Sequence, residues 1–151
     1  MNSILKQVAA LPVRKIGKGV QQVLLVTSRD TGRWIIPKGW PSKRIDDAAA
    51  ASREAKQEAG VIGRIAPTPV GSYRYRKIEA NGSRLIEVFV YVLSVEKEKK
   101  RWPEKVQRQR AWFDIATASR RVREPQLKMI ITKLNKNRRT SVLSRRAKID
   151  N

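Results

Sequence analysis

The chain contains no cysteine and no histidine among its 151 residues. The absence of cysteine excludes disulfides, thiolate nucleophiles and cysteine-based zinc sites. The absence of histidine removes the commonest general base and the commonest ligand of transition metals. Any acid–base or metal chemistry must therefore use carboxylates, of which the chain has only 13.

Long apolar runs are also missing. No run approaches the roughly 20 apolar residues of a membrane-spanning helix, and the opening MNSILKQVAALPVRK breaks its apolar stretch too soon for a secretory signal. We therefore expect a cytoplasmic protein that does not enter the membrane. A chain of this length suffices for a single sizeable core. We place one domain at residues 1–135 and a basic tail, expected to be flexible, at residues 136–151.

Acidic residues are few beside 34 lysines and arginines, which give a formal net charge of +21. So positive a field concentrates polyanions and accelerates their binding. A nucleic acid, a highly phosphorylated small molecule and an acidic partner protein all fit this charge. The excess of positive charge does not extend to residues 39–61, where four basic residues balance four acidic ones.

Hydrophobic patterning predicts an α/β protein of the α+β type. Strands are predicted at residues 8–13, 20–28, 34–36, 72–77, 85–95 and 110–113, and helices at residues 115–121 and 126–134. The dipeptide Asn81-Gly82 between two of the strands predicts a hairpin. The basic residues 97–108 are expected to form a flexible connection.

The segment GWPSKRIDDAAAASREAKQEAGV, residues 39–61, predicts one further helix with both of its ends marked. Asp46 is a suitable N-cap, the following alanines favour the helix, and Gly60 supplies a left-handed end. The helix would therefore run over residues 47–59. Lys38 and Gly39 are expected in the loop that leads into it.

Glu54 and Glu58 are four residues apart, so they project from one face of that helix, with Gln57 beside them. Two carboxylates placed in this way repel each other by a few tenths of a kcal/mol unless they share a cation. Mg²⁺ prefers oxygen ligands and typically uses one or two carboxylates together with substrate phosphates. The pair therefore indicates a divalent metal site, although a solvated helix face is the commoner meaning of such spacing.

This segment resembles the Nudix box, whose pattern is G-x5-E-x7-R-E-U-x-E-E-x-G-U with U a bulky aliphatic residue. The residues that match in register are Gly39, Arg53, Glu54, Glu58, Gly60 and Val61, and Ala55 is a small substitute for U. Ile45 and Gln57 depart from the pattern, which has glutamate at both positions. The flanking runs LLVTSRDTGRWIIPKGW, RLIEVFVYVLSVE and RQRAWFDIATA are similar to the Nudix subgroup that hydrolyses diphosphoinositol polyphosphates and dinucleoside polyphosphates.

The resemblance implies a Nudix α/β/α sandwich with a central mixed β-sheet. It also implies a pyrophosphohydrolase that cleaves a phosphoanhydride bond in a polyphosphorylated substrate, with Mg²⁺ or Mn²⁺ as cofactor. The implied metal ligands are Glu54, Glu58 and the backbone carbonyl of Lys38, with Glu104 or Glu87 as a carboxylate from outside the box. Ser28 and Arg29 correspond to residues that contact substrate phosphates in that subgroup. The substrate side should be cationic, so Arg33, Lys38 and Lys43 around the box, with Gly39, are expected to contact substrate as well.

Arg53 belongs to the catalytic set that the resemblance implies, because the box arginine orients the neighbouring carboxylates. Its side chain can still hydrogen-bond to Gln57, four residues later. An exposed helix arginine without such a role is the alternative interpretation.

Gln57 keeps a second hypothesis open, because an amide oxygen is a poorer ligand than a carboxylate for a hard cation. With fewer or weaker metal ions, the chain would be a catalytically weakened Nudix scaffold that binds nucleic acid non-specifically through its charge. A third interpretation, a factor that binds acidic protein or the ribosome, rests on charge alone. Within the first hypothesis, nucleotide and inositol substrates fit equally well.

Overall fold

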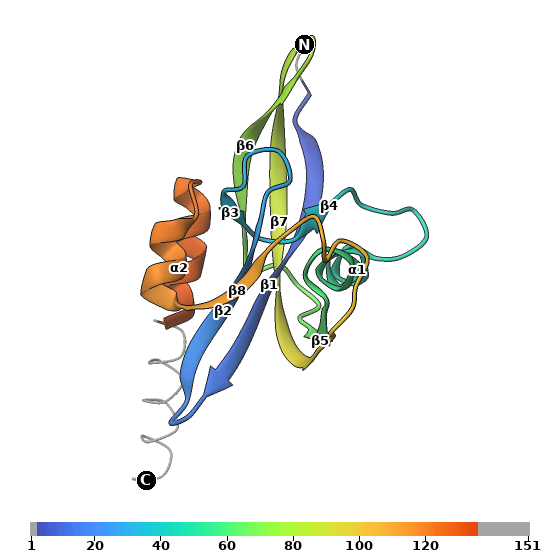
Figure 1. Ribbon diagram of the computed structural model, residues 1–151. Coiled ribbons are helices and arrows are strands. Elements are labelled where there is room, and N and C mark those ends of the chain that lie inside the picture. Colours follow the sequence, from blue (N-terminus) through green and yellow to red (C-terminus); the bar gives the residue numbers. More distant parts are fainter. Residues whose placement is uncertain (1–2, 136–151) are drawn as a thin grey trace, which may run out of the picture.

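The computed structural model describes residues 3–135, which form a mixed β-sheet between helical layers (Figure 1). The strands within these residues are β1 (Leu5–Ile16), β2 (Val20–Thr27), β3 (Trp34–Ile35), β4 (Lys38–Gly39), β5 (Val61–Ile65), β6 (Gly71–Glu79), β7 (Gly82–Glu98) and β8 (Arg110–Asp114). The helices are α1 (Asp47–Ala59), α2 (Ile115–Arg121) and a further helix over residues 125–135. The predicted α/β/α sandwich is confirmed.

Strand β1 lies at the centre of the sheet. It runs parallel to β7, from the pair Leu5 with Ile86 to the pair Val13 with Ser94, and antiparallel to β2 and β4 on its other side. Beyond these neighbours, β8 pairs with β2, and both β5 and β6 pair with β7. Residues 8–13 are all buried, which explains their continuous apolar run, because a strand covered on both faces has no polar side.

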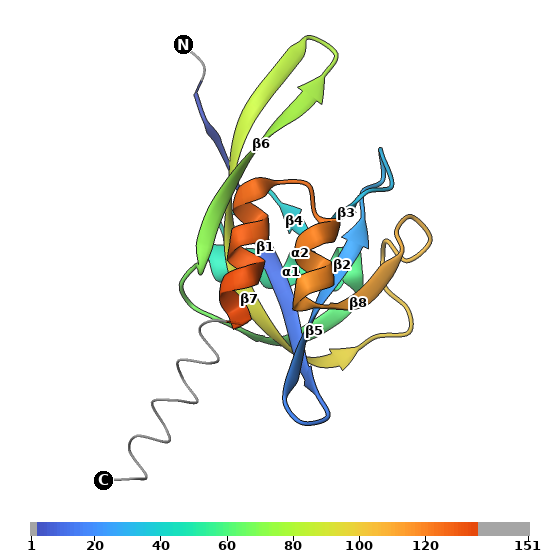
Figure 2. The ribbon, with the colours of Figure 1, turned by 90° about the vertical axis from the view of Figure 1, so that its left-hand side faces the viewer.

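The side chains of β1 alternate between two cores. Val8 and Ala10 face α1 and pack among its buried alanines. Ala9 and Leu11 face the opposite layer, where α2 and the helix over residues 125–135 lie in front of the sheet in Figure 2. Because alanine is small, α1 lies close to the sheet, and its polar residues reach the short strand β4.

Both ends of α1 form as the sequence predicts. The side chain of Asp46 accepts a hydrogen bond of 2.8 Å from the Ala49 N–H, and the Asp46 backbone is extended. Gly60 follows the last turn with a φ of 66°, a left-handed conformation that favours glycine. The predicted hairpin is also present, with Glu79 of β6 paired to Gly82 of β7.

Two strands differ from the prediction. Residues 61–65, to which no element was assigned, form β5, which pairs with the last part of β7. Residues 38–39, expected in a loop, form β4 because their backbone pairs with Val8 and Ala9. Such short or edge strands are specified by the neighbouring strand rather than by their own sequence pattern.

The prediction of a flexible connection at residues 97–108 is wrong. Its first two residues continue β7, and the next ones are held to α1. The backbone N–H of Lys99 donates to the Gly60 carbonyl at 2.7 Å, and that of Glu104 donates to the Gln57 carbonyl at 3.1 Å. This segment therefore has a fixed place beside the helix.

The predicted basic tail, residues 136–151, lies outside the described residues. Within residues 3–135, no helix combines the length and the apolar character needed to cross a membrane.

Candidate active site

The last turns of α1 carry two carboxyl groups that face each other. Glu58 is buried, with 4% of its surface exposed, and Glu54, one turn earlier, is partly buried. Their side chains are close enough to share a proton through a hydrogen bond. The two glutamates thus lie on one face of the helix, as their spacing predicts.

Strand β4 brings the backbone of Gly39 against these carboxylates. A Cβ atom at Gly39 would collide with the carboxylate of Glu54, so a larger residue here would push that carboxylate out of its present position. The adjacent Lys38 extends its ammonium group to 5.1 Å from the centre of the Tyr75 ring. Burial lowers the pKa of Lys38, and the carboxylate of Glu58 partly offsets that effect.

Burial governs the protonation of Glu58. Removal from water raises the pKa of Glu58 to about 8, while Arg108 opposes the rise and Glu54 adds to it. The pKa of Glu54 is raised as well, first by burial. A divalent cation bound between the two carboxylates would take the place of a proton, with oxygens of both side chains as its ligands. The residues at this site therefore fit a metal ion such as Mg²⁺ or Mn²⁺.

The metal-free protein is expected to become less stable as pH rises from about 5 to about 8. The unfolded glutamate releases its proton near its ordinary pKa of 4.5, whereas folded Glu58 keeps its proton until about pH 8. The folded state thus binds more protons across this interval, and the free energy of unfolding falls as pH rises. The chain has no histidine to mask the effect.

Denaturant unfolding in EDTA at several pH values measures this slope. In Glu58→Gln, which has no proton to release, the slope should flatten. An equally steep slope in that variant would assign the effect to another group.

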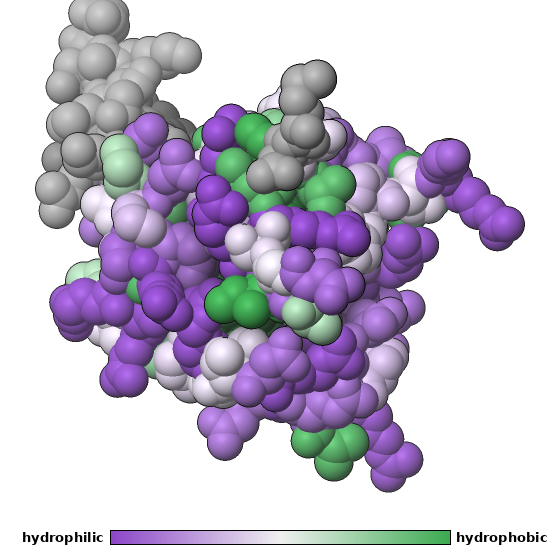
Figure 3. All heavy atoms as spheres, turned by 90° about the horizontal axis from the view of Figure 1, so that it is seen from above, coloured by the Kyte–Doolittle hydropathy of each residue, from purple (hydrophilic) through white to green (hydrophobic). Residues whose placement is uncertain are grey.

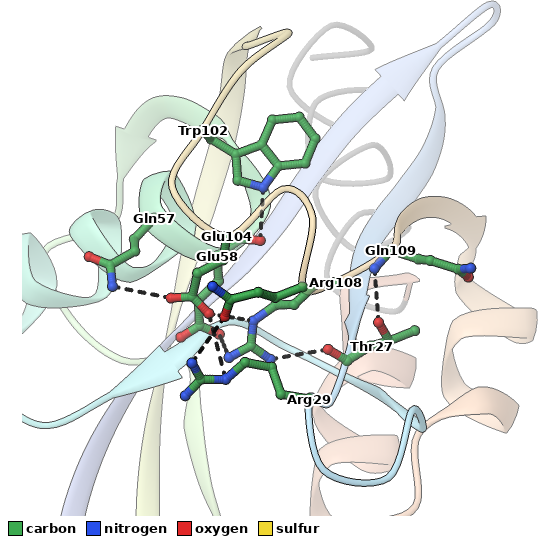
Figure 4. Close-up of polar contacts among 9 residues, drawn as sticks. Thr27, Arg29, Gln57, Glu58, Trp102, Glu104, Arg108 and Gln109 are labelled. Carbon is green, nitrogen blue, oxygen red and sulfur yellow. Dashed lines mark hydrogen bonds and ion pairs between the residues drawn. The ribbon is translucent and has the colours of Figure 1, made fainter.

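Arg108, which the sequence pattern does not mark, lies at the centre of a buried network beside these carboxylates (Figure 4). Its Nε donates to Glu104 at 2.8 Å, and its Nη2 lies 3.5 Å from Oε1 of Glu58. Its Nη1 donates to the Thr27 carbonyl at 3.1 Å. Glu104 also accepts a hydrogen bond of 3.1 Å from Nε2 of Gln57. The network joins α1, β2 and the segment before β8.

Of the two carboxylates expected from outside the box, the fold brings Glu104 to the site and leaves Glu87 elsewhere. Glu87 lies on β7 and forms an ion pair of 3.3 Å with Arg74. Both oxygens of Glu104 already accept hydrogen bonds from protein donors. Accordingly, no cluster of three acidic side chains suited to a metal ion occurs within residues 3–135. Glu54 and Glu58 are the pair that remains for a metal.

Two predicted site residues, Arg53 and Lys43, are exposed to solvent. Arg53 still lies close enough to Glu54 to favour its ionised form. Gln57 donates to Glu104 instead of forming the expected hydrogen bond with Arg53. The orientation of the carboxylates within the described network therefore depends on Arg108 more than on Arg53.

The predicted phosphate-binding residues Ser28, Arg29 and Arg33 share the loop between β2 and β3. Backbone hydrogen bonds of 2.8 Å close this loop, one from Ser28 to the Arg33 carbonyl and one from Gly32 to the Ser28 carbonyl. Nε of Arg29 lies 3.9 Å from Glu104. The loop thus places Arg29 beside Glu104. Seen from above, the surface of the molecule is mostly hydrophilic, with a few hydrophobic side chains among the polar ones (Figure 3).

Glu124 is a second residue of this region that the sequence pattern does not mark. It is buried and forms an ion pair of 2.6 Å with Arg33, 91 positions earlier in the chain. Burial raises the pKa of Tyr73 and the charge of Glu124 adds to the rise; the buried Tyr73 hydroxyl has no hydrogen-bond partner among the described residues. Only the fold brings these residues together, so no local signal could have marked them.

Comparison with known proteins places this geometry in a family. The family model described as the NUDIX domain matches residues 6–133. The chain is 36% identical over 100 residues to diphosphoinositol polyphosphate phosphohydrolase 3-beta of Bos taurus, covering 64% of this chain and 57% of the relative. It is 34% identical over 113 residues to Nudix hydrolase 16, mitochondrial, of Arabidopsis thaliana, covering 72% of this chain and 62% of that protein.

Among solved structures, the fold is similar to that of a C. elegans Ap4A hydrolase in a binary complex. The TM-score is 0.64 with 18% sequence identity, and the match covers 87% of this chain and 96% of that one. The chain spans less than two thirds of the length of the two curated relatives. The family model nevertheless covers most of the chain and includes both glutamates of α1, and the chain therefore belongs to the Nudix hydrolase family.

Proposed function

We propose that this chain is a Mg²⁺-dependent pyrophosphohydrolase that cleaves a phosphoanhydride bond in a polyphosphorylated small molecule. The substrate would be a dinucleoside polyphosphate or a diphosphoinositol polyphosphate. The observation that carries the proposal is the pair formed by buried Glu58 and partly buried Glu54 on one face of α1, with Gly39 of β4 against the Glu54 carboxylate. The similarity to a diphosphoinositol polyphosphate phosphohydrolase and, in fold, to an Ap4A hydrolase supports this substrate class.

Each group of residues has a distinct task in this reaction. Glu54 and Glu58, with the expected carbonyl of Lys38, would hold the metal ion. When bound, Mg²⁺ supplies charge neutralisation of the diphosphate and activation of a water molecule. Arg29 and Arg33 bind and orient the substrate phosphates, because a guanidinium forms paired hydrogen bonds with phosphate oxygens.

Glu124 keeps one of these cations in place. Its ion pair of 2.6 Å with Arg33 fixes the guanidinium at the end of the β2–β3 loop before substrate arrives. A cation already held in position loses less conformational freedom on binding. The nearby Lys38, whose pKa burial lowers, adds a further donor for a phosphate oxygen.

Turnover of both substrate classes, with Mg²⁺ or with EDTA, tests the proposal. We expect release of phosphate or nucleotide from at least one class in Mg²⁺ and none in EDTA. No hydrolysis of either class in Mg²⁺ would contradict the proposal. Salt-sensitive retention of RNA together with that result would favour a nucleic-acid-binding module, for which the net charge of +21 is the supporting observation.

Arg29→Ala is expected to raise KM about 10- to 100-fold with a smaller change in kcat. A hydrogen bond to a charged group contributes about 1.5–3 kcal/mol, which corresponds to this range. Arg29 suits the test because its side chain is 57% exposed and contributes little to the fold. Arg64→Ala on β5 is the matched control, since that exposed arginine lies at the other edge of the sheet. Equal KM values for the two variants would remove Arg29 from the substrate site.

A further inference from the structure

Glu104 is a buried carboxylate whose two oxygens are both used by the protein. One oxygen accepts from Nε of Arg108 at 2.8 Å, and the other accepts from Nε2 of Gln57 at 3.1 Å. Only 8% of the residue is exposed. A carboxylate held in this way by two donors needs no further cation to be stable in a buried position.

Arg108 supplies the positive charge of this arrangement. Its guanidinium is bound on three sides, to Glu104, to the Thr27 carbonyl and to Glu58, and its side chain is only 8% exposed. A guanidinium presents its donors in a rigid plane and stays protonated at all ordinary pH values. Arg108 thus places a permanent positive charge between two carboxylates, where a shared cation would otherwise be required (Figure 4).

Gln57 makes the arrangement possible. It stands where the Nudix box has glutamate, and its amide nitrogen donates to Glu104. A glutamate at this position would put two carboxylates about as close together as the amide and carboxylate are now. Two carboxylates this close repel each other even at a position as exposed as 57, and a divalent cation bound between them would remove that repulsion. Because Gln57 has an amide nitrogen where glutamate has an oxygen, Glu104 is neutralised by protein donors and no second metal ion is required there.

We infer that Gln57, Glu104 and Arg108 replace one divalent metal ion, so that this chain binds one ion fewer than it would with glutamate at position 57. Glu104 is then a positioning residue that orients Arg108 toward Glu58. The inference rests on the proposed function, because it takes the metal at Glu54 and Glu58 as given.

The Gln57→Glu variant tests the inference by metal binding alone. Mn²⁺ binding, counted by electron paramagnetic resonance or calorimetry, should give one ion per wild-type chain and two per variant chain. In EDTA, the unfolding midpoint of the variant should fall by about 5 °C or more, because the carboxylates at 57 and 104 repel each other. Addition of Mn²⁺ should restore that midpoint, whereas the wild-type midpoint should respond less.

Two further variants keep the test specific. Gln57→Glu combined with Glu104→Gln restores an amide–carboxylate pair with the partners exchanged, and it should return the count to one ion and raise the midpoint in EDTA. Gln109→Glu adds the same charge in the same segment, on a side chain that points away from the network in Figure 4, and it should behave as wild type. If Gln57→Glu does not fold in EDTA, folding restored by Mn²⁺ supports the inference, and failure to fold in both conditions overturns it.

The number of bound Mn²⁺ ions distinguishes the two possible failures. An equal number of bound Mn²⁺ ions in wild type and Gln57→Glu overturns the inference and leaves the proposed function standing. A wild-type chain that binds no Mn²⁺ overturns the metal dependence of the proposed function itself.

Discussion

Replacement of Glu58 by glutamine is expected to reduce Mg²⁺-dependent hydrolysis by about 1,000-fold. The substitution keeps the shape of the side chain and removes one of the two carboxylates available to the metal. An amide oxygen carries no net charge and binds a hard cation poorly. A metal ion contributes several kcal/mol to the stabilisation of developing charge, and a loss of about 4 kcal/mol corresponds to this factor.

The same variant is expected to fold at least as well as the wild type at pH 8 in EDTA. Wild-type Glu58 is almost fully buried, and its pKa is raised to about 8, which means that its ionised form is disfavoured there. Glutamine is uncharged, so its burial does not carry the cost of burying an ionised carboxylate. Lost activity without lost stability therefore identifies a functional role rather than a structural one.

The matched control for this substitution is Glu96→Gln. Glu96 lies on β7 with an exposed side chain, so the same chemical change should leave turnover within about twofold of wild type. Initial rates with saturating substrate and increasing Mg²⁺ provide the measurement. Glu58→Gln turnover as high as that of the control would rule out Glu58 as a metal ligand.

Replacement of Gly60 by alanine is expected to lower the free energy of unfolding by about 2–5 kcal/mol. Gly60 has a φ of 66°, where a side chain costs about 1–2 kcal/mol. Its new Cβ would also lie 2.5 Å from Cδ2 of Trp102, and overpacking of this kind costs about 1–3 kcal/mol more. Because whole domains are stable by only about 5–15 kcal/mol, this is a large fraction of the total.

Trp102 gives the Gly60 substitution a second effect. The indole donates to the Glu58 carbonyl at 3.2 Å, and the Arg110 guanidinium stacks 3.9 Å above its ring. Displacement of the indole would loosen the segment that carries Glu104 and Arg108. We therefore expect hydrolysis to decrease along with stability.

Gly17→Ala is the control that separates the cost of the left-handed backbone from the cost of the contact with Trp102. Gly17 also has a positive φ, of 51°, but a Cβ there would meet nothing within 4 Å. Gly17→Ala should therefore lower the free energy of unfolding by only about 1–2 kcal/mol, as measured by denaturant unfolding. If the two glycine variants lose equal stability, the contact between Gly60 and Trp102 contributes nothing.

Local signals explain why α1 could be predicted almost to the residue. Its N-cap Asp46, its alanines and its terminal Gly60 all act within a few positions of each other, and they determine which face carries Glu54 and Glu58. The β6–β7 hairpin is predictable for the same reason, since its turn lies between two strands that pair directly. These are the parts of the fold in which sequence neighbours are also spatial neighbours.

The parts that were not predicted depend on distant partners. The segment at residues 97–108 looks flexible by composition, yet Glu104 meets Gln57 across 47 positions and Arg108 meets Thr27 across 81. Glu124 and Arg33 are further apart still. A basic, polar stretch gives no sign of such contacts, because its order comes from acceptors that other elements supply.

The parallel pairing of β1 with β7 has a consequence for the order in which the protein can fold. Among the described strands β1 comes first in the sequence and lies at the centre of the sheet, and Ser94, the partner of Val13, is synthesised 81 residues later. The buried middle of β1 therefore lacks this neighbour until β7 has been made. Non-local pairing of this kind slows folding and exposes intermediates to aggregation. Newly made chains should therefore depend on chaperones during synthesis to an extent that the stability of the finished protein does not reveal.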